Sequence, residues 1–273
     1  MVGAKTAGKA RAVADAVQVF AWTLVLVGIV HWLLGPLERW ITRWPVVEYI
    51  AMLAVPLLWL YWTSADPADY GLGLGGLREQ LRTTLRCGIP FSAFALLSFV
   101  DWGRYALLAS MGAGLGALLL FGCVLRKRPA AGGAAAAAAP CLMAALLPHG
   151  LSAAAGGVIF YLLLLGPGEE VLFRGAIQSR LNAAFGRPFE LFGARWGWGA
   201  VLASVLFSLM HVLNLPALYE GHWAPLWWAG PVTFCLALPF AYLRERTGSV
   251  VAPALLHAFP QAIVFAIRTM VTG

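Results

Sequence analysis

The sequence predicts an all-α protein, a polytopic transmembrane bundle of about eight or nine helical spans. Hydrophobic residues make up 61% of the 273 residues and charged residues only 11%, whereas soluble domains carry roughly 25% charge. Mean hydropathy is +0.79. Apolar runs long enough to cross about 30 Å of hydrocarbon recur along the chain, and they lack the alternation of a membrane β-barrel. These observations exclude a soluble globular domain.

The apolar runs define the elements in chain order. The expected spans are 13–34, 46–62, 88–101, 105–125, 141–166, 168–186, 197–214, 226–243 and 249–268. The third is short enough to be re-entrant or merged with its neighbour. The first has a basic start but no clear cleavage site, so we interpret it as an uncleaved span. Before the third span, residues 77–86 repeat leucine and arginine every four positions, which predicts an amphipathic helix at the membrane surface.

A low-complexity segment divides the chain. Residues 129–140 are rich in Ala and Gly and predict a linker. Residues 1–128 would then hold the N-terminal spans with the interfacial helix. Residues 141–273 would form the core that carries polar side chains at membrane depth, and we expect any catalysis there.

The net charge of +7 comes from short Lys and Arg clusters between apolar runs. This pattern is typical of membrane topology signals and argues against a nucleic-acid partner. The clusters predict a cytoplasmic N-terminus and cytoplasmic far ends for the later spans. The turn at Glu169 and the loop 215–225 contain no Lys or Arg, so we expect this end of the site to lie nearer the non-cytoplasmic face. The four cysteines have no CxxC spacing and are interpreted as packing residues.

Three places put ionisable residues inside spans, where they are costly and usually functional. Glu169, Glu170 and Arg174 lie in "GPGEEVLFRG", and His211 and His257 lie in later spans. Glu170 and Arg174 are four residues apart, which predicts an ion pair along one helix face. Glu169 is rotated by about 100° from Glu170 and is free for chemistry.

The acids follow Gly166-Pro167-Gly168. We expect this tripeptide to end one helix and start another, so that Glu169 and Glu170 fall in a first helical turn. If spans 168–186 and 197–214 are antiparallel neighbours, Glu169 and His211 lie at similar depth. His257 is about 12 Å deep at 1.5 Å per residue, so all three can converge.

A carboxylate beside a neutral imidazole can activate a water molecule, while further donors stabilise an oxyanion. This combination indicates amide hydrolysis without a metal ion or cofactor. A serine nucleophile is not favoured, since "FSLMH" lacks a nucleophile elbow.

At these positions the chain resembles a known family. "EEVLFR" fits the EExxxR motif of the CPBP intramembrane glutamic proteases, which include the CAAX prenyl proteases of the Rce1 type. "FSLMH" fits the FxxxH motif, and "HAFPQ" occupies the third, His-containing motif. The resemblance covers about residues 155–268.

The resemblance implies a role for each motif residue. Glu169 and His211 would activate the water, and His257 would help form the oxyanion hole. Glu170 and Arg174 would orient the site. Relatives have an oxyanion-binding Asn four residues after the last His; Gln261 stands there in this chain and keeps the amide donor on a side chain one methylene longer. Asn214, one turn after His211, is a polar candidate without a motif.

The expected function is therefore that of a prokaryotic inner-membrane endopeptidase that cuts a peptide or protein near a membrane-embedded or lipid-modified end. Alternatives stay open at this point. One Glu and two His can bind zinc, although no HExxH is present. A non-proteolytic immunity or scaffold protein, or a transporter, could keep the same pocket. Glu170 and Arg174 could also be a buried pair that only fixes helix register.

Overall fold

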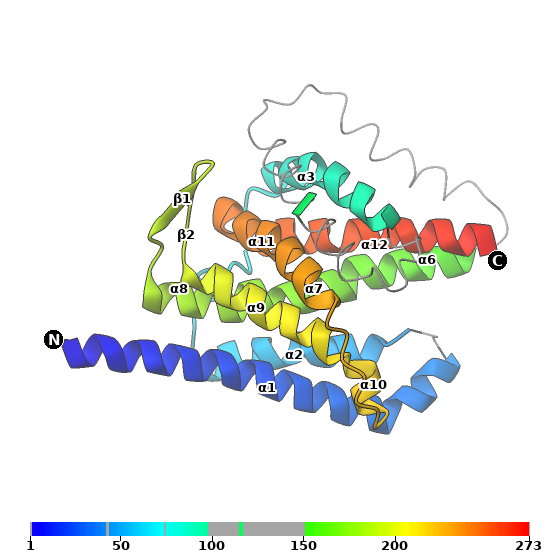
Figure 1. Cartoon of the computed structure of the whole chain (residues 1–273), viewed down its shortest axis with the longest axis horizontal. Helices are drawn as coiled ribbons and strands as arrows, with labels where there is room; N and C mark the ends of the chain where they lie inside the picture. The colour runs from blue at the N-terminus through cyan, green and yellow to red at the C-terminus, as the bar shows by residue number, and fades with distance from the viewer. Residues whose placement is uncertain (1, 42–43, 74, 98–114, 117–150, 273) are drawn as a thin grey trace.

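The computed structural model describes residues 2–41, 44–73, 75–97, 115–116 and 151–272. This part of the chain is mostly helical, as predicted (Figure 1). Three of the described helices are long and apolar enough to cross a membrane: Gly8–Glu38, Gly156–Phe185 and Val251–Thr269. The count of eight or nine spans stays a prediction. The expected span 105–125 lies almost entirely outside the described residues, and so does the linker 129–140.

The first two helices pack side by side along one edge of the bundle (Figure 1). They are α1 (Val2–Ile41) and α2 (Val46–Trp62). Small side chains recur on the buried face of α1 at Ala12 and Ala16, followed by Val19. This spacing places them on one face of the helix, so that the neighbouring helices approach closely.

The interfacial segment is part of a longer helix. α3 (Leu77–Leu97) joins the predicted amphipathic segment to the start of the predicted third span, and it packs against the last helix. Leu77 and Leu81 are exposed, whereas Gln80 and Thr84 are buried. The Thr84 hydroxyl donates to the Ala252 carbonyl at 3.2 Å. Gln80 and Thr84 therefore turn inward, and Leu77 and Leu81 are free to contact lipid.

The helix that carries the two acids is continuous. It comprises α6 (Leu151–Phe160), the π-helical segment η2 (Tyr161–Leu165), α7 (Gly166–Glu170), the π-helical segment η3 (Val171–Gln178) and α8 (Ser179–Phe185). The expected helix break at Gly-Pro-Gly was wrong, because Leu165 and Gly166 both keep right-handed helical angles.

Two features explain why the helix does not break. Proline lacks an N–H and its ring clashes with the carbonyl four residues earlier, and the wide π-type turn directly before Pro167 displaces that carbonyl. Gly166 has a packing function, since a Cβ there would lie 2.5 Å from the Ala254 carbonyl oxygen. The glycine thus lets the last helix approach the acids.

After α8 the chain forms a short β-hairpin, which was not predicted from the sequence. β1 (Phe189–Leu191) pairs antiparallel with β2 (Ala194–Trp196). Phe192 and Gly193 connect them, both with positive φ, as tight hairpin turns require. The helices α9 (Trp198–Leu213), α11 (Ala229–Thr247) and α12 (Val251–Thr272) agree with the expected spans. The short α10 (Leu215–Tyr219) lies in the segment that was expected to be a loop.

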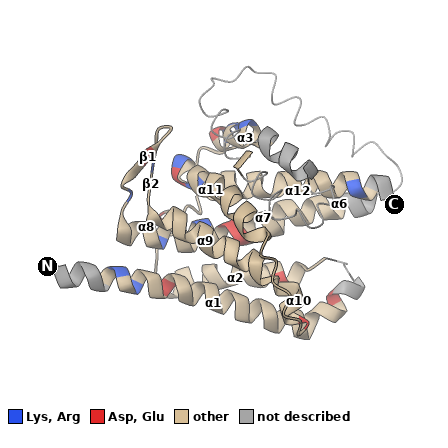
Figure 2. Cartoon of the chain, in the orientation of Figure 1, with Lys and Arg blue, Asp and Glu red and all other residues tan. Residues whose placement is uncertain are grey.

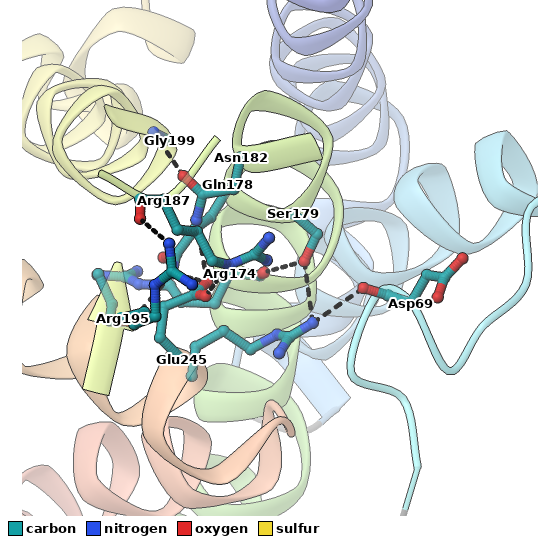
Figure 3. Close-up of polar contacts among 11 residues, drawn as sticks. Asp69, Arg174, Gln178, Ser179, Asn182, Arg187, Arg195, Gly199 and Glu245 are labelled. Carbon is teal, nitrogen blue, oxygen red and sulfur yellow. Dashed lines mark hydrogen bonds and ion pairs between the residues drawn. The ribbon is translucent and has the colours of Figure 1, made fainter. Parts of the chain in front are cut away.

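A buried polar cluster ties together α8, α9 and α11 at the end of the bundle next to the hairpin (Figure 3). Gln178 and Asn182 both donate to Glu245 Oε1, at 2.9 and 3.0 Å, and Arg187 forms an ion pair with the other Glu245 oxygen. Asn182 also accepts the Gly199 N–H at 2.8 Å and so caps α9. Figure 2 shows most of the Lys and Arg residues toward this end, whereas Asp and Glu occur at both ends of the bundle, including around α10.

Candidate active site

The predicted ion pair is present and fully buried. Arg174 Nη1 lies 3.1 Å from Glu170 Oε1, and neither side chain is exposed to solvent. Arg174 also donates to the Ala237 carbonyl at 2.9 Å, which links it to α11. The guanidinium lies over the ring of Phe207 at 4.7 Å and over that of Phe240 at 5.2 Å. Arg174 is therefore fixed between α9 and α11 by charge and by cation–π contact.

His257 lies between the two acids. Its Nδ1 atom is 2.9 Å from Glu170 Oε1, and its Nε2 atom is 3.9 Å from Glu169 Oε2. The imidazole stacks on Phe240 with 4.8 Å between ring centroids. Because the paired Glu170 carboxylate accepts hydrogen bonds, the network assigns the Nδ1 proton to His257. The structure thus brings the first and third motifs into contact, and Nε2 is aimed at Glu169.

Glu169 is buried and only partly satisfied. It is 4% exposed, and its Oε2 atom has no hydrogen-bond partner. Oε1 accepts a long hydrogen bond of 3.4 Å from the hydroxyl of Tyr49 on α2. A buried carboxylate without full hydrogen bonding is costly, which is typical of a reactive position.

His211 and Glu169 line one cavity of about 260 Å³. His211 Nδ1 is 2.9 Å from the Phe207 carbonyl oxygen. A carbonyl only accepts, so Nδ1 carries the proton and Nε2 has a free lone pair in the neutral ring. No direct hydrogen bond joins His211 and Glu169 in the described chain. The expected convergence of Glu169, His211 and His257 is therefore present, with Glu169 in the middle.

The two amide candidates differ in position. Asn214 lines the cavity, ends α9 in a left-handed conformation with φ 49°, and donates to the Ala224 carbonyl at 2.9 Å. Gln261 lies one turn after His257 on α12 and is partly buried. It is not among the residues that line the cavity. An oxyanion-binding role for Gln261 therefore stays a prediction.

Sequence analysis missed two polar contributors from the N-terminal helices. Tyr49 reaches Glu169, and Glu48 lines the same cavity while pairing with His31 Nδ1 at 2.8 Å. The sequence did contain a signal for Glu48, because Glu48 and His31 are ionisable residues inside predicted apolar spans, where such residues are usually functional. Within the described ranges, no three His, Cys, Asp or Glu side chains are grouped as ligands for one metal ion.

A comparison with models of protein families gave a match, which lies in the second half of the chain. Residues 151–263 match the sequence model of the Rce1-like family, described as type II CAAX prenyl endopeptidases. This segment is similar to the Rce1-like family, and the match covers less than half of the 273-residue chain. Searches among curated proteins and among solved structures found no match. The Rce1-like segment runs from the start of α6 into α12, and it contains Glu169, Glu170, Arg174, His211, His257 and Gln261.

The family match gives the Rce1-like segment a function class. The family consists of CAAX-type membrane proteases, which agrees with apolar helices long enough to cross a membrane. Glu48, Tyr49 and His31 lie outside the matched residues. The cavity is therefore lined jointly by the Rce1-like segment and by helices that the match does not cover.

Proposed function

We propose that this chain is an intramembrane glutamic endopeptidase that works without a metal ion. The observation that carries the proposal is the buried Glu169 carboxylate, which lies beside His257 and lines one cavity with His211. The position of these residues inside the Rce1-like segment supports the assignment.

Glu169 and His211 activate the nucleophile. A water molecule in the cavity donates one hydrogen bond to Glu169 and one to the free Nε2 of His211. Glu169 removes a proton as general base, and the hydroxide forms a C–O bond with the scissile carbonyl carbon. When the tetrahedral intermediate collapses, the C–N bond breaks and Glu169 returns the proton to the leaving nitrogen. The products are a carboxylic acid and an amine.

His257 stabilises the oxyanion of this intermediate. Its Nδ1 proton is committed to Glu170, so donation from Nε2 requires a doubly protonated ring. Glu170 and Arg174 hold the ring at this depth and act as positioning residues. Tyr49 orients Glu169 through its hydroxyl. Gln261 remains the candidate second oxyanion donor, by its position one turn after His257.

The substrate is a peptide or protein cut near its membrane-embedded or lipid-modified end, including C-terminal sorting segments. The protein would work among the lipids of a prokaryotic inner membrane, with about eight or nine spans. The Lys and Arg residues at the hairpin end support an orientation in which the Glu169–His211 cavity is nearer the non-cytoplasmic face (Figure 2).

A purified-protein assay tests the mechanism. The full-length protein in detergent is incubated with a mixed peptide library, and cleavage sites are identified by mass spectrometry. Glu169→Gln should reduce the cleavage rate by about 100-fold or more, because a general base contributes about that much. Cleavage by the unaltered protein should persist in the presence of a metal chelator.

Glu220→Gln is the matched control, since Glu220 is an exposed acid that does not line the cavity. It should cleave at the normal rate. Normal cleavage by a folded Glu169→Gln protein would contradict the glutamic mechanism. Stoichiometric zinc in the purified protein, together with inhibition by chelator, would favour the metal-dependent alternative.

A further inference from the structure

A second carboxylate faces the cavity that holds Glu169 and His211. Glu48 lines this cavity from α2, and its Oε1 atom is held by His31 Nδ1 at 2.8 Å. Its Oε2 atom makes no hydrogen bond within the described chain and is not among the fully buried oxygens. One oxygen of Glu48 is thus fixed by His31, and the other is accessible and has no hydrogen-bond partner in the described chain.

The described residues that line the cavity carry no permanent positive charge. They include Glu48, Glu169 and His211 but no Lys or Arg. Glu169 is itself nine-tenths buried and has an unpartnered oxygen. Burial, followed by the negative charge of Glu48, raises the pKa of the Tyr219 hydroxyl to about 12. An entering positive group would therefore find two carboxylates and no Lys or Arg side chain in the described lining of the cavity.

An aromatic ring completes the surroundings of Glu48. Tyr219 lines the cavity and lies 5.5 Å from the His31 ring, centroid to centroid. Its hydroxyl donates to the Leu24 carbonyl at 2.8 Å, and its ring packs on Gly28, where a Cβ would lie only 2.8 Å away. The ring is held rigidly beside the carboxylate, an arrangement that suits the alkyl chain and charge of Lys or Arg.

We propose that Glu48, held by His31 and flanked by Tyr219, is a specificity-determining subsite that binds a Lys or Arg side chain of the substrate close to the bond that is cut. The inference rests on the proposed protease function, and it adds a substrate preference to that site. An Asp or Glu at the same substrate position is disfavoured by repulsion from Glu48 and by the absence of a cationic partner.

The peptide-library assay measures this preference directly. For the unaltered protein, Lys and Arg should be enriched over Leu and Met by about tenfold at one fixed position relative to the cut, as expected for a charge-assisted hydrogen bond. Glu48→Gln keeps the side-chain shape and a hydrogen bond to His31 but removes the charge. It should lower the enrichment to less than about threefold. The control Glu220→Gln should retain the full enrichment.

The enrichment is a ratio of cleavage products measured in one preparation. A smaller amount of folded protein therefore leaves it unchanged. Equal Lys and Arg enrichment in Glu48→Gln and in the unaltered protein would overturn the subsite, as would the absence of any charge preference in the unaltered protein. If Glu169→Gln is inactive while Glu48→Gln keeps the preference, only the subsite is wrong. If Glu169→Gln still cleaves, or the unaltered protein cleaves no peptide, the proposed protease function fails first.

Discussion

We expect Gly166→Ala to destabilise the protein, although alanine usually stabilises the interior of a helix. Replacing Gly by Ala in a helix is favourable by about 0.5–1 kcal/mol, because glycine loses more backbone freedom on folding. At Gly166, however, the new Cβ would lie 2.5 Å from the Ala254 carbonyl oxygen and 2.9 Å from the Ala258 Cβ. Real Cβ atoms essentially never show contacts shorter than 3.0 Å, so the surrounding structure must move.

The element that must move is α12. Both obstructing atoms are rigid parts of this helix, so no rotamer change relieves the clash. The Ala254 oxygen must retreat by about half an ångström to reach even 3.0 Å, and overpacking of this kind costs about 1–3 kcal/mol. After the helix-propensity gain is subtracted, we expect a net loss of about 0.5–2 kcal/mol. Because Ala254 and Ala258 flank His257, its 2.9 Å contact with Glu170 should weaken as well.

Gly168→Ala is the matched control, two residues further along the same helix. Its nearest neighbour would be Tyr49 Cδ1 at 3.4 Å, an ordinary van der Waals contact. Thermal unfolding in detergent and the midpoint of SDS-induced unfolding compare the two variants. Gly166→Ala should unfold earlier than the unaltered protein, and Gly168→Ala should unfold at the same point or later. Equal shifts, or a more stable Gly166→Ala protein, would refute the close-approach argument.

Three further outcomes are expected. Arg174→Met should lower the free energy of unfolding by about 3–5 kcal/mol because it leaves a buried Glu170 unpaired, and adding Glu170→Gln should recover part of the loss; no recovery would show that the pair is not coupled. Asn182→Ala should cost about 1–3 kcal/mol in the same unfolding assay, because the Gly199 N–H loses its partner; an unchanged midpoint would contradict this. In a protein without other cysteines, His222→Cys should react with an impermeant maleimide in intact cells, and reaction only after permeabilisation would reverse the proposed orientation.

Local spacing predicted the part of the site that depends on one helix. Glu170 and Arg174 are four residues apart, so any helix through them forms the pair, and their burial follows from the apolar sequence around them. The contact between His257 and Glu170 joins residues 87 positions apart. The depth of His257 in its span predicted that it would lie near Glu169, but its contact with Glu170 was not predicted.

Other parts of the site depend on packing that has no local signal. The sequence pattern "GPG" suggested a helix break, but the close approach of α12 and the wide turn before Pro167 keep the helix continuous. The pairing of His31 with Glu48 requires α1 and α2 to lie side by side, which apolar patterns cannot specify. The β-hairpin depends on a two-residue turn between strands of three residues each, too short to produce a clear alternation.

The wide turn at Tyr161–Leu165 makes the site sensitive to chain length at that point. A π-type turn is equivalent to one extra residue inserted into an α-helix. Deleting a single residue there would restore the ordinary turn and leave the flanking helical segments on the same faces. The Pro167 ring would then clash with the carbonyl four residues earlier, and the helix would kink next to Glu169. Exchanging one apolar residue for another would keep the wide turn, so this turn should tolerate changes in composition but not a one-residue deletion.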